Sequence, residues 1–231
     1  MGSMISIAAL DGSGSFSAYR AIPAGTPKGA IVVIQEIFGV NSGIRARCDR
    51  WAEAGYSAYA LDLFWRIEPG VDLDPDVPEQ FQQALALMNK FDRDKGIADI
   101  EATIRAARAE SGGRVGVVGY CLGGLLAYLT ATRTDADATV GYYGVMIDSF
   151  LNESHCIARP LMLHFAALDG FVPAETFAKI RDGLADNARV TIHSYEGVDH
   201  GFATESGNRR REEAAQLADA RTRDFFAQHI G

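Results

Sequence analysis

The feature that most constrains the fold is a cysteine flanked by glycines at the end of an apolar run. The run over 114–118 leads into Gly-Tyr-Cys-Leu-Gly (119–123). If a strand turns sharply into a helix here, Cys121 holds a strained backbone conformation, and bulky residues two positions to either side would collide. A helix predicted over 122–133 would point its N-terminal amides and positive dipole end at the sulfur. The pattern favours a nucleophilic thiol, although a buried cysteine at a glycine-rich turn fits it equally well.

Composition sets the class of protein. The chain has 231 residues, 48% of them hydrophobic, and this fits one α/β domain with a substantial core. A net charge of -8 without any basic block argues against nucleic acid as a partner, and no apolar run approaches the roughly 18 residues that cross a membrane. Three widely spaced cysteines without metal-ligand spacing, and no recognisable signal peptide, predict a cytoplasmic protein. Residues 1–3 resemble a vector-derived leader, so we expect one domain over 4–231.

Short apolar runs alternate with helical patterns along the chain. This rhythm predicts an α/β fold with a mostly parallel central sheet and helices on both faces. The segment 66–79 departs from it because prolines and acidic residues prevent a continuous strand or helix. We expect a surface loop there, which either borders a binding site or is a solvated connector. The expected elements are a hairpin over 5–22, strands over 30–35, 57–62, 114–119, 138–143, 160–166 and 188–195, and helices near 43–54, 79–91, 94–110, 122–133, 173–186 and 209–228.

Two polar residues, first an acid and then a histidine, follow later strands. A nucleophile needs a base, and the base needs an acid that orients it. Asp169 follows the strand predicted over 160–166, and His200 follows the one over 188–195. Both would lie beyond the carboxyl ends of parallel strands, where open α/β sheets bind ligands. Taken singly, Asp169 could be a turn residue and His200 a surface side chain, but their order predicts a triad with Cys121.

Five separated motifs resemble those of dienelactone hydrolases. The motifs are Gln-Glu-Ile-Phe-Gly-Val-Asn (35–41), Gly-Tyr-Cys-Leu-Gly-Gly (119–124), Gly-Tyr-Tyr-Gly (141–144), Asp-Gly-Phe-Val-Pro (169–173) and His-Gly-Phe-Ala (200–203). The resemblance extends from about residue 15 to 226 and implies an α/β-hydrolase domain that uses no metal or organic cofactor. It also implies a small-molecule ester or lactone as the partner, with no nucleic acid and no membrane. We expect a monomer or a small homo-oligomer.

The resemblance implies a role for each site residue. Cys121 attacks the carbonyl of an ester or lactone, and His200 later activates water against the thioester. Glu36 holds the resting thiol and takes its proton when substrate binds, although a carboxylate tied to a backbone amide or an arginine would be structural. The backbone amides of Ile37 and Leu122 form the oxyanion hole, where removing one donor costs about 10²–10³ in rate.

The expected substrate pocket departs from the family pattern. The side chains at 81, 85 and 88 share one face of the helix predicted over 79–91, a spacing that a core stripe would also show. Dienelactone hydrolases carry an arginine, a tyrosine and a tryptophan there, and a second arginine where this chain has Thr204. Those arginines clamp the substrate carboxylate. This chain lacks both at those positions, and a carboxylate against the apolar wall of its pocket would be poorly solvated. We therefore expect a more neutral, more apolar ester or lactone, unless Arg66 or Arg209 supplies a guanidinium. The pocket residues that we expect are Phe38, Phe81, Leu85, Met88, Tyr143, Phe171 and Thr204.

The sequence thus predicts a cofactor-independent ester or lactone hydrolase with a cysteine nucleophile and a pocket more apolar than that of dienelactone hydrolases. An alternative is carboxymethylenebutenolidase (dienelactone hydrolase) of chlorocatechol degradation, with the carboxylate clamp rebuilt elsewhere. A third reading is a non-catalytic α/β-hydrolase fold that binds a ligand or senses oxidants through Cys121. The presence of Glu36, Asp169 and His200 together argues against this last reading.

Overall fold

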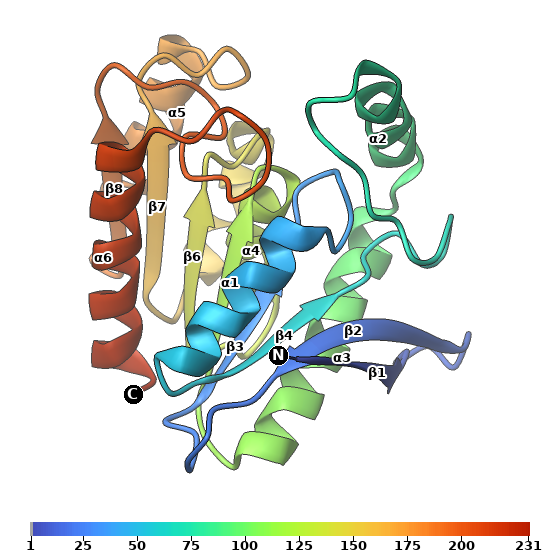
Figure 1. Ribbon diagram of the computed structural model, residues 1–231. Helices are drawn as coiled ribbons and strands as arrows, with labels where there is room; N and C mark the ends of the chain where they lie inside the picture. The colour runs from blue at the N-terminus through green and yellow to red at the C-terminus, as the bar shows by residue number, and fades with distance from the viewer. Residues whose placement is uncertain (1) are drawn as a thin grey trace.

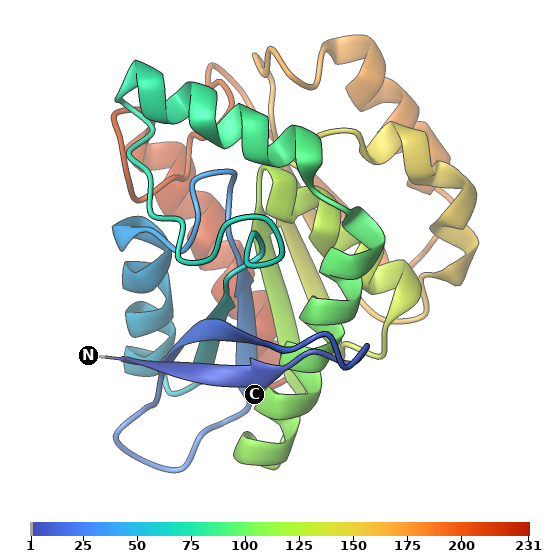
Figure 2. The same cartoon turned by 90° about the vertical axis from the view of Figure 1, so that its right-hand side faces the viewer.

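A computed structural model describes residues 2–231 and contains an eight-stranded sheet flanked by helices (Figures 1 and 2). The strand order is β1-β2-β4-β3-β5-β6-β7-β8. The hairpin β1–β2 and the pair β2–β4 are antiparallel, whereas the other pairs are parallel, so the mostly parallel α/β prediction is confirmed. Of the predicted leader, Met1 lies outside the described residues, while Ser3 begins β1. The strands are β1 (Ser3–Ala8), β2 (Ser15–Ala21), β3 (Ala30–Ile34), β4 (Ser57–Leu61), β5 (Val115–Tyr120), β6 (Ala138–Tyr142), β7 (Leu161–Ala166) and β8 (Val190–Tyr195).

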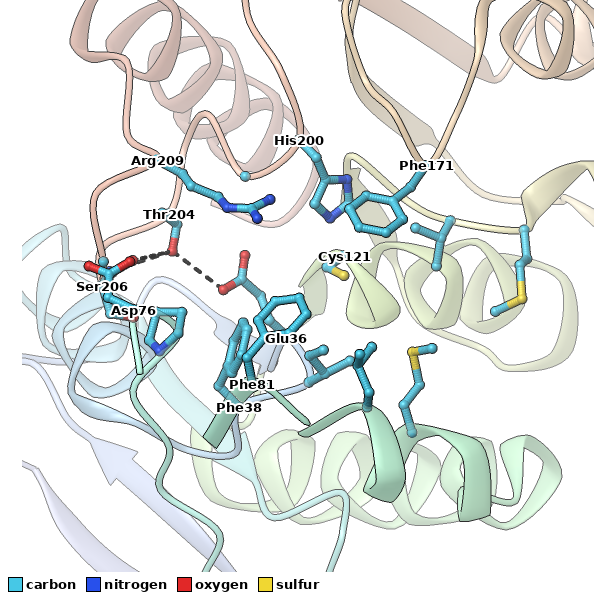
Figure 3. Close-up of a pocket in the computed structure, with 18 residues that line it drawn as sticks. Glu36, Phe38, Asp76, Phe81, Cys121, Phe171, His200, Thr204, Ser206 and Arg209 are labelled. Carbon is cyan, nitrogen blue, oxygen red and sulfur yellow. Dashed lines mark hydrogen bonds between the residues drawn. The ribbon is translucent and has the colours of Figure 1, made fainter. Parts of the chain in front are cut away.

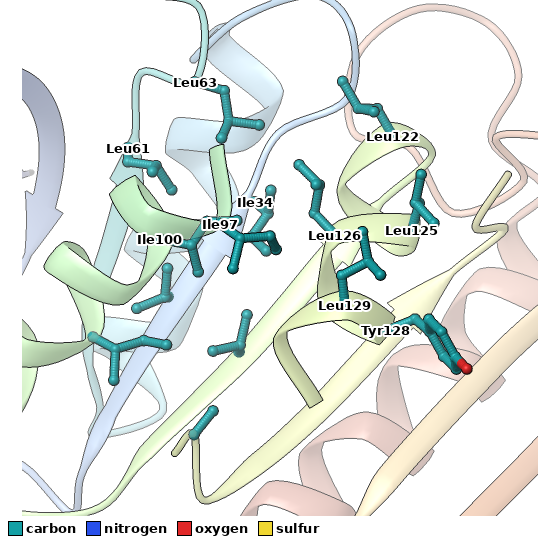
Figure 4. Close-up of a cluster of buried hydrophobic side chains, with 14 of the residues drawn as sticks. Ile34, Leu61, Leu63, Ile97, Ile100, Leu122, Leu125, Leu126, Tyr128 and Leu129 are labelled. Carbon is teal, nitrogen blue, oxygen red and sulfur yellow. The ribbon is translucent and has the colours of Figure 1, made fainter. Parts of the chain in front are cut away.

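Helices cover both faces of the sheet, as predicted. One hydrophobic core joins the sheet to α3, α4 and α5, and Figure 4 shows its part around α3 and α4. A second core joins the opposite face to α1 and α6. The strands β3, β4, β5, β6 and β7 are buried along their whole length, because helices cover both faces of this part of the sheet. Among residues 2–231, no helix combines the length and apolarity needed to span a bilayer. The helices are α1 (Ser42–Glu53), α2 (Pro78–Lys90), α3 (Arg93–Ser111), α4 (Leu122–Arg133), α5 (Ala174–Leu184) and α6 (Glu212–His229), with a 3₁₀ helix η1 (Ile147–Cys156).

The 3₁₀ helix η1 was not predicted from the sequence. Its apolar residues Ile147, Phe150 and Leu151 pack on the core, and polar contacts with α4 hold it in place. The hydroxyl of Tyr128 donates to the carbonyl of Phe150 at 3.0 Å, and Arg133 forms an ion pair with Glu153 at 2.7 Å. These contacts fix η1 against α4, which is the helix that begins at the predicted nucleophile.

The predicted loop 66–79 is irregular up to residue 77, and its last two residues belong to α2. Pro78 is the first residue of that helix, where a proline costs no hydrogen bond. The loop is anchored to the segment after β3, because the Leu73 amide donates to the Phe38 carbonyl at 2.9 Å, and to α1, because Arg45 pairs with Asp72 at 2.8 Å. As a result α2 lies above the carboxyl end of the sheet, apart from the two helical layers (Figure 1).

Candidate active site

Cys121 occupies a tight turn between β5 and α4. Its backbone angles are φ 57° and ψ -113°, a conformation that a residue with a side chain rarely adopts. A Cβ atom at Gly119 would overlap the carbonyl oxygen of Gly123, and one at Gly123 would lie 2.6 Å from the carbonyl oxygen of Gln35. The glycines are therefore required for this turn, as the sequence indicated. The turn presents a partly exposed Cys121 to a cavity at the carboxyl end of the sheet (Figure 3).

His200 and Asp169 come together next to this turn. Nδ1 of His200 lies 2.9 Å from Oδ2 of Asp169, and the Asp169 side chain is fully buried. The other carboxylate oxygen of Asp169 accepts from the amides of Phe171, at 2.8 Å, and Val172, at 3.3 Å. The loop after β7 thus holds the carboxylate, and the carboxylate orients the imidazole. Nε2 of His200 is buried and has no hydrogen-bond partner among residues 2–231. Because His200 lines the cavity, this nitrogen is free to exchange a proton with a bound substrate or water.

The electrostatic environment of His200 favours its protonated form. Burial lowers the pKa of the imidazole, but the negative charge of an ionised Cys121 and the hydrogen bond with Asp169 outweigh it and raise the pKa to about 10. An imidazolium at His200 would in turn pair with a thiolate at Cys121, since both side chains line the same cavity. Such a pair is how cysteine nucleophiles are activated near neutral pH.

Glu36 lies at the same cavity and is held by hydroxyl groups. The hydroxyl of Tyr143 donates to Oε1 at 3.1 Å, and that of Thr204 donates to Oε2 at 3.3 Å. Burial, and then the charge of Glu36, raise the pKa of Tyr143 well above its usual value, so the phenol remains a donor. Within residues 2–231, no cation lies in ion-pair range of Glu36. The carboxylate is therefore tied neither to an arginine nor to a backbone amide, the two structural roles considered from the sequence.

The two backbone amides expected to form the oxyanion hole lie on either side of the turn at Cys121 in the fold. Leu122 opens α4, and Ile37 follows β3; both residues are nearly buried. Neither amide has a hydrogen-bond acceptor among the described residues. Unpaired N–H groups at a helix start attract negative charge, which applies to Leu122, while Ile37 lines the cavity.

The cavity has a volume of about 230 Å³ and is mostly apolar. Six of the seven expected pocket side chains line it. The exception is Tyr143, which packs behind the cavity with its ring 5.0 Å from that of His200. Lining residues that the sequence did not single out include Val145 and Met146, which follow β6 as Asp169 and His200 follow their strands, so the same rule could have found them. The other additions are Pro75 and Asp76 from the acidic loop, Gly201, and Ser206 and Gly207 from the segment before α6.

The two arginines considered as a replacement clamp have different surroundings. Arg66 forms two hydrogen bonds with Asp99, at 2.8 and 2.9 Å, and an ion pair with Asp11 at 2.9 Å. It does not line the cavity. Arg209 does line it, and its guanidinium points inward between His200 and Thr204 (Figure 3).

Comparison with known proteins identifies the family of this chain. The model of the dienelactone hydrolase family matches residues 16–230. The chain belongs to the dienelactone hydrolase family. It is 41% identical to the carboxymethylenebutenolidase of Pseudomonas putida, over 96% of this chain and 95% of that one. A candidate carboxymethylenebutenolidase of Azospirillum brasilense is 47% identical over 98% of this chain and 99% of its own.

Solved structures give the same fold. A candidate dienelactone hydrolase from Klebsiella pneumoniae superimposes with a TM-score of 0.84 at 28% identity, covering 98% of this chain and 100% of that one. Membership of the dienelactone hydrolase family makes this protein an ester or lactone hydrolase of the α/β-hydrolase fold. Of the two hydrolase readings drawn from the sequence, the relatives favour carboxymethylenebutenolidase over a hydrolase of more neutral esters.

Proposed function

We propose that this dienelactone hydrolase family member is a carboxymethylenebutenolidase that uses Cys121 as its nucleophile. The observation that carries the proposal is that Cys121, Ile37 and His200 line one cavity while Asp169 holds the imidazole of His200. The names of the relatives support dienelactone as the substrate. The apolar wall formed by α2 had favoured a neutral substrate, but the guanidinium of Arg209 provides a partner for a carboxylate.

Acylation begins with ionisation of the thiol. Glu36, which lines the cavity beside Cys121, takes the thiol proton, and the thiolate pairs with the imidazolium of His200 (Figure 3). The thiolate attacks the lactone carbonyl, and the amides of Ile37 and Leu122 stabilise the negative oxygen. Collapse of this intermediate breaks the ring C–O bond. The leaving oxygen takes a proton from His200, and a thioester remains on Cys121.

Deacylation uses the same histidine as a base. Once the thioester has formed, the thiolate charge that raised the pKa of His200 is gone, so the neutral imidazole persists. It removes a proton from water, and the resulting hydroxide attacks the thioester. The thiolate leaves and takes back the proton held by Glu36, while the new carboxylic acid loses its proton to solvent and the enol becomes a ketone. Asp169 holds the imidazole in one orientation through both steps.

The test is hydrolysis of cis- and trans-dienelactone and of short acyl p-nitrophenyl esters by the purified protein. We expect dienelactone to have the higher kcat/KM and Cys121→Ala to abolish turnover. Cys156→Ala is the matched control, because this free cysteine is exposed and lies outside the cavity. Equal turnover by Cys121→Ala would refute the nucleophile. Failure on dienelactone with good turnover of neutral esters would refute the substrate. Rapid peroxide modification of Cys121 without any turnover would favour the redox-sensing alternative.

We also propose a cytoplasmic location and a monomer or small homo-oligomer. All three thiols are free, Cys48 buried, Cys121 partly exposed and Cys156 exposed, which suits a reducing compartment. Cell fractionation and size-exclusion chromatography test these two points. Recovery in a secreted fraction, or a large assembly, would contradict them.

A further inference from the structure

Arg209 brings a free guanidinium to the cavity. It makes no ion pair or side-chain hydrogen bond with any residue from 2 to 231, whereas the next two arginines are engaged. Arg210 pairs with Glu205 at 2.8 Å and with Glu212 at 2.7 Å, and Arg211 donates to backbone carbonyls. Only the first of these three consecutive arginines is therefore directed at the cavity and left with its donors unused.

The position of this guanidinium is set by the turn that carries His200. The side-chain stem of Arg209 lies across Gly201, since a Cβ at that position would come within 3.2 Å of Cδ of Arg209. Gly201 also has a φ of 79°, which favours glycine. This packing holds the stem next to the catalytic imidazole, so the guanidinium faces the part of the cavity where substrate meets His200 (Figure 3).

The carboxylates near Arg209 have other partners. The hydroxyls of Tyr143 and Thr204 hold Glu36, and Asp199 accepts from the amide of His200 at 2.6 Å. That amide lowers the pKa of Asp199, and the charge of Arg209 contributes less. Asp76 lines the same cavity but forms no ion pair with Arg209. The guanidinium is thus available to an incoming anion, while the carboxylates of Glu36 and Asp76 disfavour a second negative charge.

The side of the cavity formed by α2 is apolar. Phe81, Leu85 and Met88 line it, and the ring of Phe81 lies 5.8 Å from that of Phe38. We propose that Arg209 binds a single carboxylate of the substrate while the α2 side receives an apolar substituent, so the preferred substrates are monoanionic lactones or esters with an apolar group. This inference rests on the proposed function and assigns its specificity to a residue outside the positions where the family carries its arginines.

Kinetics with paired substrates test the role of Arg209. The substrates are dienelactone and protoanemonin, a neutral lactone without the carboxylate, and the variants are Arg209→Gln, Arg209→Lys and the control Arg211→Gln. A charge-assisted hydrogen bond of the usual strength corresponds to a loss of about 10- to 150-fold in kcat/KM on dienelactone for Arg209→Gln, mainly as a higher KM. The loss on protoanemonin should be at least tenfold smaller. Arg209→Lys should be intermediate, because it keeps the charge but not the planar fork.

A second measurement does not depend on turnover. Cys121 is alkylated with iodoacetate, which carries a carboxylate, and with neutral iodoacetamide. The rate with iodoacetate divided by the rate with iodoacetamide should fall about tenfold or more in Arg209→Gln and stay unchanged in Arg211→Gln. An unchanged ratio, or equal losses on both lactones, would overturn the inference. If wild-type protein fails on dienelactone but the alkylation ratio falls, the proposed function is wrong and the carboxylate-binding role of Arg209 stands.

Discussion

Replacing Cys121 with alanine should lower the pKa of His200. Burial acts to lower this pKa, and it is outweighed first by the charge of Cys121 and then by the hydrogen bond with Asp169. Alanine removes the thiolate but leaves Asp169 in place, so the imidazole loses its largest stabilising charge. The same loss occurs when the thioester forms, and the variant therefore reports the state of His200 during deacylation.

The size of the change follows from the interaction of two unit charges. At a separation of about 4 Å and an effective dielectric constant of about 20, the attraction is about 4 kcal/mol. One pKa unit corresponds to about 1.4 kcal/mol. The pKa of His200 should therefore fall by about three from its value of about 10 in the native protein. His200 would then be largely protonated beside the thiolate at pH 8, and largely neutral without it.

Proton NMR titration of the imidazole resonances measures this change. The chain has five histidines, and loss of one resonance in His200→Gln assigns the signal. Cys156→Ala is the control, because it removes an exposed thiol that contacts His155 at 3.4 Å and leaves the cavity intact. An unaltered pKa of His200 in Cys121→Ala would refute the thiolate–imidazolium pair, and so would a native pKa below 6.5.

Three further predictions concern the turn, the buried histidine and the Glu36 contact. Gly119→Ala should destabilise the protein by more than about 4 kcal/mol, because its Cβ would overlap a backbone carbonyl, whereas Gly170→Ala meets no atom within 4 Å and should have little effect in the same denaturant titration. Burial lowers the pKa of His164 well below 6.5, so below that pH the unfolded chain takes up a proton that the folded chain does not. Unfolding free energy should drop by up to about 1.4 kcal/mol per pH unit below pH 6.5, and less steeply in His164→Gln; identical pH profiles would contradict this. Tyr143→Phe keeps the ring but removes the donor to Glu36, and kcat/KM on dienelactone should fall about 2- to 13-fold; unaltered kinetics would count against that contact.

The sheet and the turn at Cys121 could be predicted because both are encoded by residues that are neighbours in the chain. Continuous apolar runs identified the buried parallel strands, and the glycines around Cys121 identified the turn. The 3₁₀ helix η1 has no such signal, since contacts such as the hydrogen bond from Tyr128 hold it. The start of α2 at Pro78 was displaced by one residue, because a proline fits either the end of a loop or the first turn of a helix.

The placement of individual side chains at the site was less predictable. Tyr143 was expected in the pocket wall, but a φ of 38° directs it behind the cavity toward Glu36. Arg66 and Arg209 were equal candidates from the sequence, and only the fold shows that Asp99 engages the first while the second faces the substrate. These outcomes depend on how separate loops lie relative to one another, and no local pattern reports that.

By itself, the sequence determined the α/β architecture, the turn that exposes Cys121 and the order in which Asp169 and His200 follow it. Those properties depend on backbone sterics and on the burial of consecutive residues. The tertiary structure decided which hydroxyls hold Glu36, from residues 107 and 168 positions away, and which arginine reaches the cavity. A long side chain takes its partner from whatever packing brings within reach, so substrate specificity is set in three dimensions on a framework that the sequence already specifies.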